Sequence, residues 1–68
     1  MEFHINIQCD NEVFGFVAFD AKPEIARILR KYADRLDADG EIDCRLTDIN
    51  GNVVGEAAMK FTDEEEQQ

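Results

Sequence analysis

The sequence has no serine and no tryptophan, one histidine, and only two cysteines. Without serine, the commonest hydroxyl nucleophile is missing, and His4 would need a nucleophile beside it to act as a base. A zinc site needs close to four Cys or His ligands, and the chain offers three. It also lacks a glycine loop of the kind that cradles phosphates. We therefore expect a protein that is not an enzyme and holds neither a metal nor a cofactor.

Long apolar runs and export signals are missing too. No run of about 20 apolar residues occurs, so no segment is expected to cross a membrane. The N-terminus lacks a basic region followed by an apolar run, so no secretion signal is expected. Cys9 and Cys44 lie far apart in the sequence and form no cysteine motif, so we expect reduced thiols that face the core. A Cys9–Cys44 disulfide is the less favoured alternative. A cytoplasmic protein is expected.

Basic residues are few. Seven lysines and arginines stand against 16 acidic residues, which gives a net charge of −9 at pH 7. A field of that sign repels nucleic acid and anionic membranes, and it favours a protein partner with a basic surface. The alternative is that the charge serves only solubility. Five of the seven basic residues fall between Lys22 and Asp37, so the acidity belongs mainly to the rest of the chain.

The segment from Lys22 to Asp37 predicts an amphipathic α-helix. Its large apolar residues recur at helical spacing, at Ile25, Ile28, Leu29, Tyr32 and Leu36. Asp20 precedes the segment as the expected N-cap, and Gly40 follows it as the expected stop. This helix is expected to cover one face of a sheet made by the remaining residues.

Four segments predict strands: Phe3–Cys9, Val13–Phe19, Ile42–Thr47 and the residues after Asn50-Gly51. Asp10-Asn11 is expected to turn a first hairpin, and Asn50-Gly51 predicts a type I′ turn in the second, with Ile49 opposite Asn52. In the second hairpin, the pattern pairs Leu46 with Gly55, Cys44 with Ala57 and Arg45 with Glu56. The two hairpins and the helix predict an α+β fold, a single ββαββ domain over residues 1–61. Residues 62–68 are expected to form an acidic disordered tail.

The Val13–Phe19 segment is apolar on both sides. The expected register of the first hairpin places Phe14, Phe16 and Ala18 on the apolar face of the sheet, and Val13, Val17 and Phe19 on the outer face. Either that strand is central and its outer side chains are partly shielded, or this face meets a partner. Ordinary scatter of apolar residues on a small surface is the third possibility.

Two functional hypotheses follow. A compact acidic domain can act as a DNA mimic that blocks a nucleic-acid-handling protein, because carboxylates stand in for phosphates. The residues expected to supply this charge are Asp10, Glu12, Asp20, Asp37, Asp39, Glu41, Asp43, Asp48 and Glu56. The alternative is a small adaptor or homo-oligomeric assembly protein that uses the outer sheet face or a strand edge. Direct nucleic-acid binding through the helical arginines and lysines is disfavoured by the net charge and by the lack of accompanying aromatics.

A resemblance bears on the first hypothesis. The stretches Ile25 to Leu36 (IARILRKYADRL) and Asp48 to Glu56 (DINGNVVGE) resemble small acidic proteins encoded by phages and mobile elements. Those proteins share a helix ending in ADRL and a hairpin reading D-x-NGN-x-VG, and anti-CRISPR proteins are among their kind. The resemblance covers about half the chain. It implies a viral inhibitor in the cytoplasm of a bacterial host, which binds a Cas effector and blocks its target DNA. It carries over no individual site residue.

Overall fold

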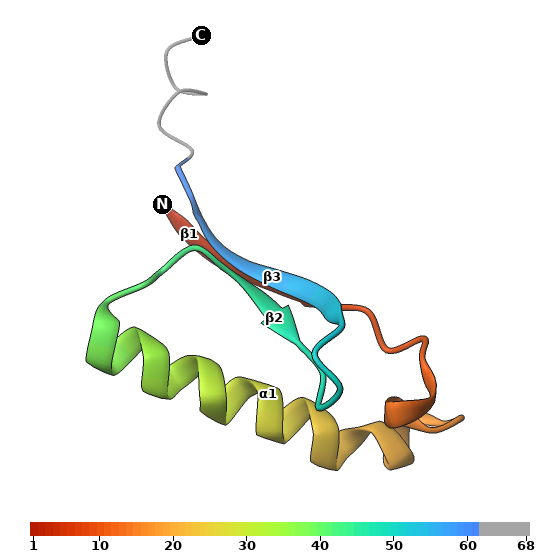
Figure 1. Cartoon of the computed structure of the whole chain (residues 1–68). Coiled ribbons are helices and arrows are strands. Elements are labelled where there is room, and N and C mark those ends of the chain that lie inside the picture. The colour runs from red at the N-terminus through yellow and green to blue at the C-terminus, as the bar shows by residue number, and fades with distance from the viewer. Residues whose placement is uncertain (62–68) are drawn as a thin grey trace, which may run out of the picture.

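Figure 1 shows the computed structural model of the chain, which describes residues 1–61. Its elements are β1 (Glu2–Ile7), the short 3₁₀ helix η1 (Glu12–Phe14), α1 (Ala18–Asp39), β2 (Cys44–Thr47) and β3 (Val53–Lys60). The described residues form an α+β domain with one α-helix along one face of a three-stranded antiparallel sheet, so the predicted class is confirmed. The predicted tail over residues 62–68 lies outside the described residues.

Strand β3 occupies the middle of the sheet, whose order is β1-β3-β2. The predicted register of the second hairpin is confirmed at three pairs, Cys44–Ala57, Arg45–Glu56 and Leu46–Gly55. Alternation of apolar and polar residues fixes this register, because a slip by one residue would turn the apolar side chains toward solvent.

The turn of this hairpin differs from the predicted type I′ turn. The register shifts after Leu46, so that Thr47 pairs with Val53. The Gly51 N–H donates to the Asp48 carbonyl at 3.0 Å, and Gly51 has a φ of 89°, whereas Asn50 keeps a negative φ. A type I′ turn needs positive φ at both central residues, so the observed loop is a wider turn followed by glycine in the left-handed region.

The predicted first hairpin is wrong, and residues 1–61 do not form the ββαββ arrangement. Strand β1 pairs with β3 instead, and the predicted strand Val13–Phe19 becomes η1, a bend and the start of α1. Two local features explain this outcome. The Asn11 side chain accepts from the Val13 N–H at 3.1 Å and so caps η1. Gly15 adopts a φ of 75°, which interrupts an extended run.

Helix α1 is longer than the predicted Lys22–Asp37 segment. It begins at Ala18, and Asp20 lies in its first turn and is not the N-cap, a position held by Val17. The carboxylate of Asp20 still lies near the positive end of the helix dipole. The predicted stop is confirmed, because Gly40 caps the helix with a φ of 72° and returns its N–H to the last turn at 2.9 Å.

The core lies between α1 and the sheet, and η1 closes it at the N-terminal end of the helix. Phe14, only 1% exposed, enters it from η1 and meets Ile28 of α1 and Leu46 of β2 within one apolar cluster. The Tyr32 hydroxyl donates to the Ile42 carbonyl at 2.6 Å, which satisfies the polar end of a buried ring.

The two cysteines are free thiols, and they differ in environment. Cys44 packs against the core as predicted. The expectation for Cys9 is wrong: its side chain is exposed, because Cys9 lies beyond the end of β1, where the chain leaves the sheet toward η1.

Candidate functional site

Seven of the nine acidic residues predicted for partner binding fall into two groups, one in or before the first turn of α1 and one in or after its last turns, and two residues lie apart. At the N-terminal end are Asp10, Glu12 and Asp20; at the C-terminal end are Asp37, Asp39, Glu41 and Asp43; Glu56 stands alone on β3. All of these are exposed. The rise of an α-helix places Asp20 and Asp39 about 28 Å apart. The structure therefore gives two acidic ends, and Arg27, Arg30 and Lys31 lie between them on the helix.

Asp48 is the exception, because it is only 3% exposed. Its Oδ1 accepts from the backbone N–H groups of Asn50 and Asn52, both at 2.9 Å. Its Oδ2 accepts from the side-chain amides of Asn11 at 2.8 Å and Asn52 at 3.2 Å. Asp48 therefore orders the β2–β3 turn and connects it to the segment before η1. Its carboxylate is fully engaged inside the chain, so it does not belong to the charged surface predicted from the sequence.

Glu24 is a second buried carboxylate, and sequence reasoning missed it. Arg27 donates to it from Nε at 3.0 Å and from a terminal nitrogen at 2.9 Å, and the Ile49 N–H donates at 2.9 Å. Arg27 also donates to the Thr47 carbonyl at 3.2 Å. The pair thus connects α1 to the β2–β3 turn. The sequence does contain an indication that Glu24 is buried: it lies four residues before Ile28, on the helix face that packs against the core.

Both buried carboxylates have pKa values below their ordinary range. The hydrogen bond from Arg27 is the main cause for Glu24; it lowers the pKa more than burial raises it, and the Ile49 N–H adds to the effect. For Asp48, burial acts most strongly and raises the pKa, but the hydrogen bonds from Asn52, Asn11 and Asn50 together outweigh it. Both groups are therefore ionised in the folded protein at neutral pH.

These lowered pKa values predict a loss of stability in acid. In the unfolded chain, Glu24 and Asp48 return to pKa values near 4, so protons bind the unfolded chain first and favour unfolding. Their stabilising effect is complete above about pH 5 and is lost as the pH falls through the lowered values of the folded state. Urea unfolding of the wild type and of Asp48→Asn between about pH 6 and pH 3 checks this. We expect the stability difference between the two proteins to shrink as the pH falls.

The Asp48→Asn comparison isolates the buried group. Repulsion among the exposed acids also changes with pH, but it is nearly the same in both proteins and cancels in the difference. A stability difference that stayed constant from pH 6 to pH 3 would show that the Asp48 carboxylate has an ordinary pKa in the folded state.

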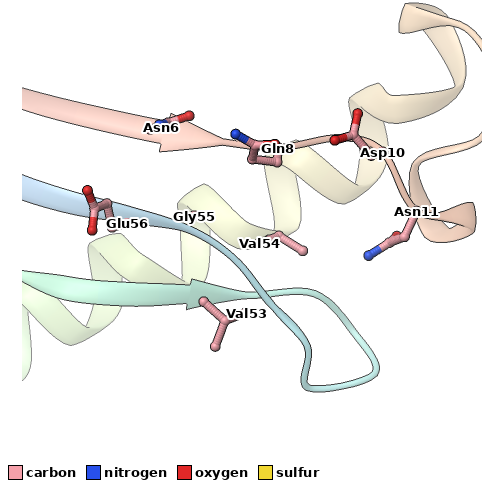
Figure 2. Close-up of a pocket in the computed structure, with 8 residues that line it drawn as sticks. All are labelled: Asn6, Gln8, Asp10, Asn11, Val53, Val54, Gly55 and Glu56. Atoms are coloured by element: carbon pink, nitrogen blue, oxygen red, sulfur yellow. The ribbon is translucent and has the colours of Figure 1, made fainter.

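An open hollow of about 450 Å³ lies where β1 leaves the sheet (Figure 2). Its lining comes from β1, the segment after it and the start of β3: Asn6, Gln8, Asp10, Asn11, Val53, Val54, Gly55 and Glu56. The polar lining consists of amides and carboxylates, which suits hydrogen-bond donors or a cation better than an anion. This lining includes no histidine, cysteine, hydroxyl or basic side chain, so it offers no nucleophile for covalent catalysis.

The lone histidine lies on the sheet and is exposed. His4 Nε2 is 2.9 Å from the Glu2 carboxylate, and its register partner on β3 is Ala58, which has no reactive group. Within residues 1–61, no three His, Cys, Asp or Glu side chains lie close enough to share a metal ion. The contacts described for His4 thus include a carboxylate but no nucleophile that the imidazole could activate.

The strongest surface feature is an apolar cluster where η1 leads into α1. Phe16 is 98% exposed and Phe19 73% exposed, and Val17 between them is exposed as well. The positive φ of Gly15 turns the chain here, so that Phe14 enters the core while Phe16 points into solvent. We call Phe16, Val17 and Phe19 the aromatic end. Exposed apolar residues that gather in one place mark binding surfaces, so this short segment is the part of the surface considered for a partner.

Charged side chains adjoin the aromatic end. Asp20 packs against Gly15, since a Cβ atom placed on that glycine would lie 2.3 Å from the Asp20 Cβ. Glu12 is exposed in η1, and its carbonyl accepts from the Gly15 N–H at 3.0 Å. The Lys22 ammonium lies 4.7 Å from the centre of the Phe19 ring. The expectation that Val13, Val17 and Phe19 lie on the outer face of the sheet is wrong. Val17 and Phe19 are exposed, but they lie where η1 leads into α1, and Val13 packs against the core.

Comparisons with protein-family models, with characterised proteins and with solved structures gave no match to this chain. In the described part of the chain, no helix combines the length and the apolar character needed to cross a bilayer. The class that the fold itself defines is a small α+β domain.

Proposed function

We propose that this protein is a small acidic inhibitor that binds a basic surface on a nucleic-acid-handling protein. The observation that carries the proposal is the aromatic end, where the exposed rings of Phe16 and Phe19 lie in the same short segment as the exposed acids Glu12 and Asp20. This combination joins apolar anchors with the charge that a basic partner requires.

The energetics of interfaces support this assignment. Aromatic side chains that enter a pocket and are surrounded by polar groups supply much of the binding energy in protein complexes. The acidic surroundings then select a basic partner and raise the rate of encounter, because the net charge of −9 attracts it over long distances.

Nucleic-acid-binding surfaces are basic, so an acidic ligand on such a surface excludes the nucleic acid. The exposed acids do not form one continuous row, because the basic stretch of α1 separates its two acidic ends. The inhibitor therefore acts through one end of the molecule, and mimicry of DNA is local rather than extended. The resemblance to anti-CRISPR proteins makes a Cas effector complex the first partner to test.

The test is binding to purified Cas effector complexes and to basic complexes recovered from bacterial lysate. We expect retention at about 50 mM salt, loss at about 500 mM salt, and competition by duplex DNA. Phe16→Ala is expected to weaken binding at least about tenfold, because Phe16 is a central anchor with almost no contacts in the free protein.

Two charge-reversal variants show whether binding depends on where the acidic residues lie or only on the net charge of the chain. Asp10→Lys with Glu12→Lys changes the N-terminal acidic end, and Asp37→Lys with Asp39→Lys makes the same change in net charge at the other end of α1. We expect the first pair to abolish binding and the second to reduce it only slightly. Equal losses from both pairs, or binding that survives Phe16→Ala unchanged, would rule out the aromatic end as the contact surface.

A further inference from the structure

The turn between β2 and β3 carries the only asparagine of the chain that is followed by a glycine. The four asparagines are Asn6, Asn11, Asn50 and Asn52, and the residues after them are an isoleucine, a glutamate, a glycine and a valine. Glycine has no Cβ atom, so its backbone nitrogen can approach the side-chain amide carbon of the asparagine before it. A branched side chain at that position hinders the same approach. The sequence therefore singles out Asn50-Gly51 for reaction between a side chain and the backbone.

The contacts of the four asparagines point to the same residue. The side-chain amides of Asn11 and Asn52 donate to Asp48 Oδ2 at 2.8 Å and 3.2 Å, which holds both in place. Asn6 lies within β1, where pairing with β3 keeps its backbone extended. Asn50 is exposed, and its side-chain amide makes no hydrogen bond within residues 1–61. The Asn50 side chain is therefore free to rotate toward the backbone nitrogen that follows it.

From this combination we propose that Asn50 is a site of spontaneous deamidation, for which water is the only co-reactant. The Gly51 nitrogen attacks the Asn50 Cγ and forms an N–Cγ bond, while the Cγ–Nδ2 bond breaks. The proton of the Gly51 N–H leaves with the amide nitrogen as ammonia, and a cyclic imide remains. Water then cleaves one of the two bonds between the imide nitrogen and a carbonyl carbon; its hydroxyl joins the carbon and its proton joins the nitrogen. Cleavage at Cγ gives aspartate, and cleavage at the backbone carbon gives isoaspartate.

The residue that controls the rate of this reaction is Asp48. The Gly51 N–H, which must lose its proton, donates to the Asp48 carbonyl at 3.0 Å. The Asp48 carboxylate accepts from the N–H groups of Asn50 and Asn52, on either side of Gly51, both at 2.9 Å. Its negative charge opposes loss of a proton from the amide between them. Deamidation therefore proceeds from a locally opened turn, and the fraction of time that the turn is open sets its rate.

The products weaken the contact between the turn and η1. Isoaspartate adds one atom to the backbone before Gly51, so the turn no longer closes with the same hydrogen bonds to Asp48. Either product also adds a carboxylate beside Asp48, and the two negative charges repel. Asp48 is the partner of Asn11, whose side chain caps η1. Deamidation thus loosens η1 irreversibly and limits how long the chain keeps this structure; the inference does not depend on the proposed function.

Incubation of the full chain at mildly alkaline pH in isotope-labelled water, followed by peptide mapping, tests the proposal. We expect Asn50 to lose ammonia and take up oxygen from water, with isoaspartate as part of the product. Asn6, Asn11 and Asn52 are expected to remain intact over the same period. The rate should be at least about tenfold below that of a synthetic peptide of residues 47–54, because opening the turn breaks several hydrogen bonds.

Two variants examine the role of Asp48. Asp48→Ala is expected to speed deamidation of Asn50 at least about fivefold, toward the rate of the peptide, because the hydrogen bonds to the Asp48 carboxylate are lost. Glu56→Ala removes an exposed carboxylate from the same hairpin and should leave the rate unchanged. The comparison of the wild type with the peptide remains decisive if Asp48→Ala does not fold.

The deamidated protein, separated from the unmodified protein by ion exchange, shows the structural effect. We expect a lower urea midpoint and faster amide exchange in the β2–β3 turn and in η1. The inference would be overturned by an Asn50 that stays intact in the folded chain while the peptide is fully converted, or by equal conversion of all four asparagines. A wild-type rate equal to that of the peptide, or a folded Asp48→Ala variant with the wild-type rate, would contradict control by Asp48.

Discussion

The Phe14→Ala variant is expected to lose most of its stability. Phe14 is 1% exposed and joins η1 to the cluster formed by α1 and the sheet. Removal of a buried Phe ring costs about 3 to 5 kcal/mol, whereas a domain of this length has a free energy of unfolding of roughly 3 to 10 kcal/mol. In urea, where the slope is about 1 kcal/mol per molar, the midpoint should fall by about 3 M or the protein should be unfolded without urea.

Phe16 is the matched control. It lies two residues away, has the same side chain and is 98% exposed. Phe16→Ala should therefore shift the urea midpoint by less than about 0.5 M, since exposed substitutions change stability by less than about 0.5 kcal/mol. If the two variants had similar midpoints, the assignment of Phe14 to the core and of Phe16 to the surface would be wrong.

The Gly55→Ala variant is expected to disrupt the pairing of β1 with β3. A Cβ atom on Gly55 would lie 1.8 Å from the Asn6 carbonyl oxygen and 2.9 Å from the Ile7 Cα. These are backbone atoms, so the clash is relieved only if β1 moves away. Overpacking of this kind costs about 1 to 3 kcal/mol, and more where backbone must shift. We expect the unfolding temperature to fall by roughly 10 °C and the β1 amides to lose protection from exchange.

Gly40→Ala is the comparison for that experiment. Nothing lies within 4 Å of a Cβ atom at Gly40, and the cost of the alanine there comes from its φ of 72° alone, roughly 1 to 2 kcal/mol. It should lower stability without selective loss of protection in β1. Protection of β1 that is unchanged in Gly55→Ala would show that the strands are further apart than described.

Local sequence patterns correctly predicted the helix and the second hairpin, both of which are determined by residues close together in the sequence. The helix follows from the spacing of Ile25 to Leu36, and the second hairpin follows from Asn50-Gly51 between two alternating runs. Both depend on residues fewer than about 20 positions apart, and in both the pattern leaves few alternatives.

The prediction of the first hairpin was wrong because the partner of β1 is also determined by residues far away in the sequence. Val13–Phe19 is a short apolar run, and such a run fits a strand or a helix start equally well. Gly15 in its middle was the informative residue, since a glycine inside a strand pattern suggests a break. Gly55 permits the observed partner, because a Cβ atom there would lie 1.8 Å from the Asn6 carbonyl oxygen of β1.

The candidate site was only partly predictable for a related reason. Charge counting identifies acidic residues but does not distinguish Asp48, which is buried in a turn, from Asp43 or Glu56, which are exposed. Only part of the aromatic end follows from the sequence: Val17 and Phe19 are predicted on the outer face of a sheet, whereas they are exposed where η1 leads into α1. Its most exposed member, Phe16, had been assigned to the apolar face of a strand, because the turn at Gly15 was not foreseen.

The central position of β3 also has a consequence for how the chain acquires its structure during synthesis. Strand β3, with which both other strands pair, is the last of the described elements to be synthesised. Its pairing with β1 joins Lys60 to Glu2, nearly opposite ends of the described chain. A nascent chain that has released β1 and α1 still lacks the strand that β1 pairs with, so the complete sheet forms only once Lys60 has left the ribosome. Such long-range pairing is slow compared with local contacts. Until then, the open strand β1 and the aromatic residues are accessible to chaperones and to other nascent chains.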